Sequence, residues 1–175
     1  MKTNIELSII IPVYNVEKYL AECLQSAYNI TGIHKEIIII NDGSTDNSAL
    51  IIDDFLSLYP NETVVKTQVN QGVSVTRNVG LKLATGDYIL FLDSDDTFED
   101  GAVFELLRYA QKHDLDLRQA RATYFGDLPT SLMPKPAEVL DAPVGSGHSL
   151  LKKYCEVASI KNADFRPEVW LMLLK

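Results

Sequence analysis

Two stretches of almost uninterrupted apolar residues constrain the fold of this chain more than any other feature. They are Leu7–Val13 and Glu36–Asn41, and the second contains a run of isoleucines. Neither stretch alternates apolar with polar residues, as a strand with one solvated face would, so both are typical of strands covered on both faces. Pro12 is expected to end the first strand, because proline has no N–H to donate to a sheet ladder.

Outside these strands, apolar residues recur at the spacing of helices that bury one face. A weaker strand is predicted at Thr63–Val69 and a buried one at Tyr88–Leu92. Helices are expected from Val16 with Asn15 as cap, after Asp46, after Gly72 with Val75, Val79 and Leu83 inside, and after Gly101. Strands alternating with helices predict an α/β fold, a doubly wound and mostly parallel sheet of Rossmann-like architecture.

The strand at Tyr88–Leu92 ends abruptly in an Asp-Ser-Asp-Asp motif, Asp93–Asp96. Carboxylates this close repel one another unless a cation neutralises them. Mg²⁺ or Mn²⁺ takes oxygen ligands, typically one or two carboxylates completed by water and phosphate oxygens. One interpretation is therefore a metal site at Asp95, assisted by Asp93 or Asp96. The other is a solvated acidic turn that caps the next helix through Asp96 or the threonine after it.

Polar or aromatic residues follow every predicted strand, at the sheet edge where open α/β folds bind ligands. They are Pro12, Tyr14 and Asn15 after the first strand, Asp42 and Gly43 after the second, Asn70, Gly72 and Arg77 after the third, and Asp93–Asp96 after the fourth. Each has an ordinary explanation on its own: packing for Tyr14, a turn for Asp42, a solvated charge for Arg77. Their convergence at one edge suits a nucleotide diphosphate.

The residue types suggest a division of labour at that edge. Tyr14 is suited to flank a base, and an ionised Asp42 to accept the ring N–H of uracil or a similar base. Arg77 offers a planar fork to phosphate oxygens, and the helix that begins near Gly72 presents backbone N–H groups to the same place. A metal at Asp95 would bridge both phosphates and stabilise the charge that develops as the diphosphate leaves.

The stretch from Leu7 to Leu107 resembles the bacterial family 2 glycosyltransferases. The resemblance rests on the order and spacing of Ile11–Asn15, Asn41–Asp46, Asn70–Gly72 with Arg77-Asn78, and Leu92–Asp96. It implies a GT-A fold and the inverting, metal-dependent transfer of a sugar from a nucleotide diphosphate sugar, usually a UDP-sugar. The implied acceptor is a glycan or lipid-linked glycan in polysaccharide biosynthesis. The family roles place Pro12 and Tyr14 on the base, Asp42 as its reader, Asp93 on the ribose or donor, and Asp95 as principal metal ligand.

The region after Asp114 carries less signal. An inverting transferase needs a general base, and the family pattern places it after a segment like Val169–Lys175, so we expect it beyond Lys175. Asp164 and Glu168 are candidates only by default. The expected elements are a strand at Leu117–Phe125, a loop at Leu128–Gly147, a short helix at Ser149–Val157 and the start of a helix at Pro167–Lys175. We expect a nucleotide-sugar-binding core at 1–114 and a partial acceptor-side region at 115–175, truncated at its C-terminus.

Charge and cysteine content restrict the partners and the compartment. The formal charge of −8 argues against nucleic acid or an anionic membrane surface as the main partner. No signal peptide or apolar run of membrane-spanning length is present. Cys23 and Cys155 fit no metal spacing and are expected as free thiols, Cys23 in the core. We therefore expect a cytoplasmic protein, with any contact to the inner face of the membrane made by residues beyond its C-terminus.

Two other functions compete with transfer. Because no general base is identifiable, the chain is alternatively a nucleotide-sugar-binding module without transfer activity. A sugar nucleotidyltransferase is a weaker alternative, since such an enzyme is expected to carry a Gly-rich, basic loop after the first strand to hold a triphosphate. The residues there are Pro12–Asn15, which form no such loop.

Overall fold

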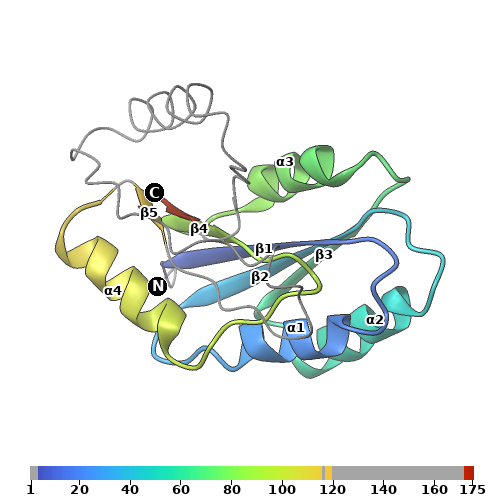
Figure 1. Ribbon diagram of the computed structural model, residues 1–175, viewed down its shortest axis with the longest axis horizontal. Coiled ribbons are helices and arrows are strands. Elements are labelled where there is room, and N and C mark those ends of the chain that lie inside the picture. The colour runs from blue at the N-terminus through green and yellow to red at the C-terminus, as the bar shows by residue number, and fades with distance from the viewer. Residues whose placement is uncertain (1–3, 116, 120–171) are drawn as a thin grey trace, which may run out of the picture. The chain divides into compact units, whose positions relative to one another are not determined.

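The computed structural model describes residues 4–115, 117–119 and 172–175, which belong to one compact unit of the chain (Figure 1). Its elements are β1 (Leu7–Val13), α1 (Leu20–Tyr28), β2 (Lys35–Asn41), α2 (Ser48–Leu58), β3 (Thr63–Thr67), α3 (Val73–Leu83), β4 (Tyr88–Phe91), α4 (Ala102–Lys112), β5 (Leu117–Gln119) and β6 (Met172–Leu174). The other unit, Ala120–Pro167, lies outside the described residues. The predicted loop at Leu128–Gly147 and helix at Ser149–Val157 fall there.

The elements form one sheet with the strand order β3-β2-β1-β4-β6-β5. β3, β2, β1 and β4 run parallel, whereas β6 runs antiparallel to both of its neighbours. α1, α2 and α4 pack on one face of the sheet and α3 on the other (Figure 1). The predicted doubly wound, mostly parallel α/β architecture is confirmed.

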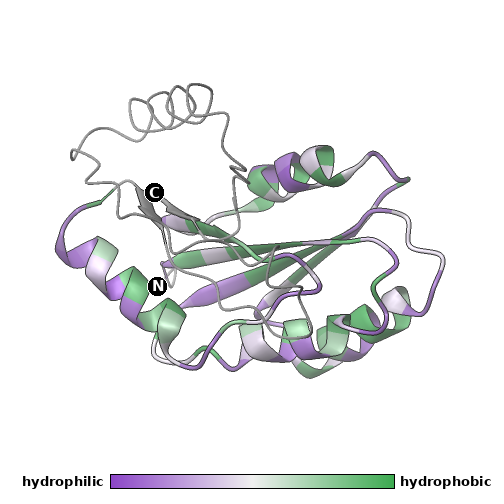
Figure 2. Ribbon diagram, in the orientation of Figure 1, coloured by the Kyte–Doolittle hydropathy of each residue, from purple (hydrophilic) through white to green (hydrophobic). Residues whose placement is uncertain are grey.

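The apolar strands belong in the middle of this sheet because their side chains alternate between its two faces. In β1, Ile9 and Ile11 join the core under α1, α2 and α4, whereas Ile10 joins the smaller core under α3. All three are fully buried. Figure 2 shows hydrophobic residues along these strands and mixed faces on the helices. An uninterrupted apolar stretch is thus what a strand needs when helices cover both of its faces.

Pro12 does not end β1, which continues to Val13 and stays paired with β2. The carbonyl of Ile10 accepts the N–H of Leu92 on the β4 side, whereas the carbonyl of Val13 accepts the N–H of Asp42 on the β2 side. Strand residues alternate in direction, so Pro12 faces the β4 side, where β4 has already ended at Phe91. The missing N–H therefore leaves no ladder bond broken.

Two helix predictions were wrong in detail. α1 begins at Leu20, and Asn15 does not cap it but adopts a left-handed conformation with φ of 52°. In α3 the predicted inner residue Val75 is 39% exposed, and the buried positions are Thr76 and Gly80. Gly80 lies so close to Ile10 that an added Cβ would come within 2.3 Å of its Cγ2. Glycine thus lets α3 approach the sheet closely, and the predicted inner residues Val79 and Leu83 pack against the core under this helix.

The predicted start of a helix at Pro167–Lys175 was also wrong, because Met172–Leu174 form β6 between β4 and β5. The periodicity of a short apolar run does not distinguish a helix from a strand. Here the free edge of β4 offered backbone partners, and the segment became a strand. The strand predicted at Leu117–Phe125 is β5 over Leu117–Gln119, and its remainder lies outside the described residues. The strand predicted to reach Val69 ends at Thr67.

Cys23 is a buried free thiol, as predicted, whereas Cys155 lies outside the described residues. Among the helices that the structure describes, none combines the length and apolar character needed to cross a membrane.

A polar cluster ties α4 to the start of β1. The carboxylate of Glu6 accepts hydrogen bonds from Arg108, from the backbone N–H of His34 at 2.9 Å and from Gln111 at 3.1 Å. The bond from Arg108 is the main cause that lowers the pKa of Glu6 from 4.5 to about 2; burial opposes it, and the other two bonds and the charge of Arg108 add to it. Glu6 therefore stabilises the fold fully above pH 4.5, and this contribution is lost as the pH falls toward 2.

Replacing Glu6 by glutamine is expected to lower the free energy of unfolding at neutral pH, because Arg108 and the His34 N–H lose a charged acceptor. The difference from the unchanged protein should shrink between pH 4.5 and about 2. Urea unfolding at several pH values measures it. Asp54→Asn removes the same charge from an exposed position on α2 and is the control. A pH-independent deficit in Glu6→Gln would contradict this assignment.

Candidate functional site

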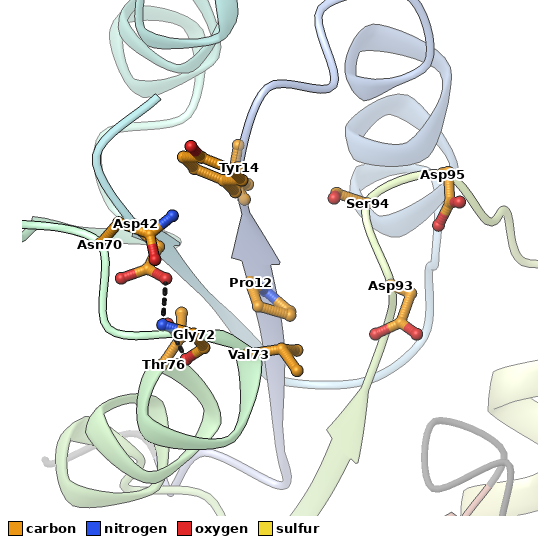
Figure 3. Close-up of a pocket in the computed structure, with 11 residues that line it drawn as sticks. Pro12, Tyr14, Asp42, Asn70, Gly72, Val73, Thr76, Asp93, Ser94 and Asp95 are labelled. Atoms are coloured by element: carbon orange, nitrogen blue, oxygen red, sulfur yellow. Dashed lines mark hydrogen bonds between the residues drawn. The ribbon is translucent and has the colours of Figure 1, made fainter. Parts of the chain in front are cut away.

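The segments that follow β1, β2, β3 and β4 line a cavity of about 230 Å³ at the carboxyl ends of the parallel strands (Figure 3). The sequence predicted ligand binding at this edge. The lining residues are Pro12, Val13, Tyr14, Asp42, Asn70, Gly72, Val73, Thr76, Asp93, Ser94 and Asp95. Most of the residues proposed from the sequence are among them; Asn15, Gly43, Arg77 and Asp96 are not.

The cavity has two chemically different sides, with Pro12 between them (Figure 3). On one side lie Asp42, Asn70, Gly72 and Thr76, and on the other Asp93, Ser94 and Asp95. Tyr14 follows directly after β1 and is 49% exposed, so its ring is accessible to a ligand. Carboxylates stand on both sides: Asp42 is buried, Asp93 is partly buried and Asp95 is exposed.

Asp42 is 3% exposed and organises the loop that precedes α3. One carboxylate oxygen accepts hydrogen bonds from Gln68 Nε2 at 2.7 Å and from the Gln71 N–H at 3.0 Å, and the other accepts the Gly72 N–H at 2.9 Å. Burial by itself would raise the pKa of Asp42, but these hydrogen bonds outweigh it, and the pKa is lowered. A carboxylate has about four lone-pair sites, so an ionised Asp42 keeps room for one further donor.

Gly72 shapes the same loop and leads into α3. Its φ of 86° lies in the region that favours glycine. α3 begins at Val73, which lines the cavity, so the N-terminus of this helix faces the ligand space. Backbone N–H groups at a helix N-terminus attract anions. This side of the cavity therefore combines one acceptor, Asp42, with a backbone suited to a negatively charged group.

Arg77 is turned toward Asp93. Its Nη2 lies 2.6 Å from Asp93 Oδ1, and its guanidinium lies 5.8 Å from the centre of the Phe91 ring. Arg77 Nε is buried and has no hydrogen-bond partner among the described residues. The arginine that the sequence assigned to phosphate thus pairs with a carboxylate that the sequence assigned to the ribose and the metal. The pair links α3 to the end of β4.

The acidic turn after β4 rests on α1. The Asp96 N–H donates to the Asp93 carbonyl at 3.0 Å, and the Cys23 thiol donates to the same carbonyl at 3.5 Å. Ser26 Oγ accepts the Phe98 N–H at 3.1 Å. Burial raises the pKa of the Cys23 thiol, and the nearby carboxylates raise it further, so the thiol stays protonated and able to donate. α1 therefore supports the turn at both ends.

Asp95 fits the predicted role of metal ligand better than the other two carboxylates of the motif. Its side chain is exposed and lines the cavity, whereas Asp93 is paired with Arg77. The described residues contain no group of three or more His, Cys, Asp or Glu side chains arranged to hold a metal ion. One carboxylate agrees with Mg²⁺ or Mn²⁺ chemistry if water and phosphate oxygens complete the coordination.

Some residues of the site were not found from the sequence. Gln68 escaped because the third strand was expected to reach Val69, which placed Gln68 inside a strand instead of at its end. Thr76 is fully buried, lines the cavity, and its hydroxyl donates to the Gly72 carbonyl at 2.9 Å. Its position one helical turn after Gly72 is the signal that could have identified it. Ser94 belongs to the predicted Asp-Ser-Asp-Asp motif, but no separate role was assigned to it from the sequence.

Asn15 and Gly43 do not line the cavity, but both shape the loops that follow the strands. Gly43 has a φ of 77°, and a Cβ there would lie 3.0 Å from the Asn70 nitrogen, so glycine permits the loops after β2 and β3 to approach each other. Asn15 bonds to the loop after β2, where its Oδ1 accepts the Thr45 N–H at 2.7 Å.

Comparison with known proteins agrees with this architecture. The sequence model described as glycosyl transferase family 2 matches residues 8–149. The minor teichoic acid biosynthesis protein GgaB of Bacillus subtilis is 42% identical over 112 residues, which are 63% of this chain and 12% of GgaB. The poly(ribitol-phosphate) beta-glucosyltransferase of Bacillus spizizenii is 38% identical over 115 residues, 64% of this chain and 18% of that protein.

A solved structure has a similar fold. The crystal structure of S. aureus TarS 1-349 in complex with UDP-GlcNAc has a TM-score of 0.61 and 28% sequence identity. The match covers 75% of this chain and 39% of that one. The chain thus spans well under half the length of these relatives, so the activity of a whole relative does not transfer to it directly.

Proposed function

The chain belongs to glycosyl transferase family 2, and from this premise we propose that it transfers a sugar, with inversion, from a UDP-sugar to a glycan or lipid-linked glycan. Membership confirms the resemblance seen in the four motifs, and the predicted GT-A fold is confirmed with it. Relatives named for teichoic acid synthesis favour a role in polysaccharide biosynthesis. The donor, the acceptor and the stereochemistry are the parts that we propose.

The observation that carries this proposal is the arrangement of Asp42 and Asp95 on opposite sides of one cavity. Asp42 is ionised, buried and able to accept one more hydrogen bond, which suits the ring N–H of uracil. Tyr14 flanks the base from the mouth of the cavity. The backbone at the start of α3 then faces the diphosphate.

A divalent cation fits the other side of the cavity. Asp95 would hold Mn²⁺ or Mg²⁺ together with water and phosphate oxygens. When bound, the ion neutralises the diphosphate and the negative charge that develops on it as the glycosidic bond breaks. Asp93, held by Arg77, would then orient the ribose through its second carboxylate oxygen. Arg77 acts on the donor through this pair.

Inverting transfer also needs a general base for the acceptor hydroxyl. Our assignment of that base to residues beyond Lys175 stays a prediction, as do the division of the chain near residue 114 and a cytoplasmic location at the membrane. A nucleotide-sugar-binding module without transfer activity is the second candidate, favoured by the confinement of the described site to donor-side chemistry.

Titration calorimetry with UDP, dTDP and GDP, each with and without Mn²⁺, tests the donor site. We expect UDP to bind most tightly and Mn²⁺ to strengthen its binding, because an acidic cavity needs a cation to accept a diphosphate. Failure of UDP to bind in either condition would overturn the proposal. Turnover of UDP-sugars by this chain would exclude the pure binding module, whereas tight UDP binding without turnover would favour it.

A further inference from the structure

Two neighbouring loops beside the cavity are joined by a network of hydrogen bonds. The first loop, Tyr14–Glu17, follows β1, and the second loop, Gly43–Asn47, leads from the end of β2 to Ser48, the first residue of α2. The Asn15 N–H donates to Ser44 Oγ at 3.1 Å, and the Thr45 N–H donates to Asn15 Oδ1 at 2.7 Å. Asn15 is thus bonded to the second loop through both its backbone and its side chain.

The contacts continue along both loops. The Val16 N–H donates to Ser48 Oγ at 3.1 Å and the Glu17 N–H to Asp46 Oδ2 at 3.0 Å. In the opposite direction, Glu17 Oε2 accepts the Asn47 N–H at 2.8 Å. Each loop therefore supplies acceptors for the backbone N–H groups of the other, and neither is shaped by its own residues alone.

Tyr14 is the residue that depends on this arrangement. Its ring is 49% exposed, and in the described part of the chain its hydroxyl has no hydrogen-bond partner. Its backbone therefore sets where the ring lies. That backbone is held on one side by β1 and on the other by Asn15, which has a φ of 52° in a bend of the chain directly after Tyr14. Asparagine adopts this conformation more readily than most residues.

We propose that Asn15 is a positioning residue for the donor base: it holds Tyr14 at the mouth of the cavity by locking the first loop to the second. The inference rests on the proposed function, since it assigns Tyr14 to the base of a UDP-sugar. It replaces direct ligand contact, which the sequence suggested for Asn15, with an indirect role. The acceptor oxygen of Asn15 is the essential group, and its amide nitrogen is dispensable.

Three variants of Asn15 distinguish positioning of Tyr14 through the acceptor oxygen from direct contact with the ligand. Asn15→Asp keeps the acceptor for the Thr45 N–H and should bind UDP nearly as well as the unchanged protein. Asn15→Gly permits the positive φ but removes the acceptor, and Asn15→Ala removes both. We expect about tenfold weaker UDP binding for Asn15→Ala and an intermediate loss for Asn15→Gly. The control is Gln25→Ala, which removes an exposed hydrogen bond from Gln25 on α1 to Asn29, the residue after this helix.

The readout is the affinity for UDP and for UMP by calorimetry, at a temperature where every variant is folded. The losses should be equal for both ligands, since Asn15 is proposed to act on the base, which UDP and UMP share. If Asn15→Ala bound UDP like the unchanged protein, the positioning role of Asn15 would be overturned, but the proposed function would not. A loss in Asn15→Asp as large as in Asn15→Ala would replace it with direct contact through the amide. Failure of the unchanged protein to bind UDP would overturn the proposed function as well.

Discussion

Replacing Asp95 by asparagine is expected to abolish most of the gain in UDP affinity that Mn²⁺ produces, a loss of roughly 100-fold. Asp95 is the exposed carboxylate of the acidic turn that lines the cavity, and asparagine is a neutral and much weaker ligand for a hard cation. UDP affinity without metal should change little, because Asp42 and Tyr14 on the other side of the cavity stay intact.

Two comparisons sharpen this experiment. Glu99→Gln removes the same charge from an exposed residue of the same segment and should keep the full effect of Mn²⁺. Asp93→Asn should weaken UDP binding both with and without metal, because it breaks the ion pair that holds Arg77. If Asp95→Asn responded to Mn²⁺ like the unchanged protein, the metal would have to bind elsewhere and our assignment would be wrong.

Replacing Gly86 by alanine is expected to destabilise the fold by about 2–4 kcal/mol. A Cβ at this position would lie 2.7 Å from the Ser8 nitrogen and 2.9 Å from the Leu7 carbonyl carbon, both backbone atoms of β1. β1 is paired on both sides and cannot move away from the methyl group. Any movement of residue 86 away from β1 would also strain the 2.8 Å hydrogen bond from its N–H to Ser8 Oγ.

Urea unfolding measures the loss of stability. Gly101→Ala is the matched control: nothing lies within 4 Å of a Cβ there, so its effect comes only from a φ of 76°. That strain is roughly 1 kcal/mol. If Gly86→Ala had the same free energy of unfolding as the unchanged protein, the segment around Gly86 would be able to move away from β1. That result would contradict the prediction.

Gly86 also illustrates how local patterns mislead. A glycine shortly after an apolar helical pattern predicts the end of that helix, but α3 already ends at Leu83, and Gly86 instead permits the close approach of β1. Pro12 was expected to stop a strand and instead occupies a position where no partner needs its N–H. At both positions the residue type suits its place in the structure, but the reason is the contact or pairing with a neighbouring strand and not the end of an element.

The sequence by itself determined the layered α/β sheet and the edge at which the candidate site lies. Apolar runs, helical spacing and the order of elements depend on neighbouring residues and on chain connectivity, and both are written in the sequence. The sequence did not determine which side chains pair with one another at that edge. The pairing of Arg77 with Asp93, of Asp42 with Gly72 and of Asn15 with Thr45 joins residues 16 to 30 positions apart.

Only the tertiary structure decided these partners, because they depend on how strands align and on which way each loop turns. Sequence spacing identified residues that share an edge but not the direction of their side chains. For the same reason it could not place Met172–Leu174, whose apolar character suits a helix as well as a strand. The open side of β4 made them a strand, and that edge exists only once the sheet has formed.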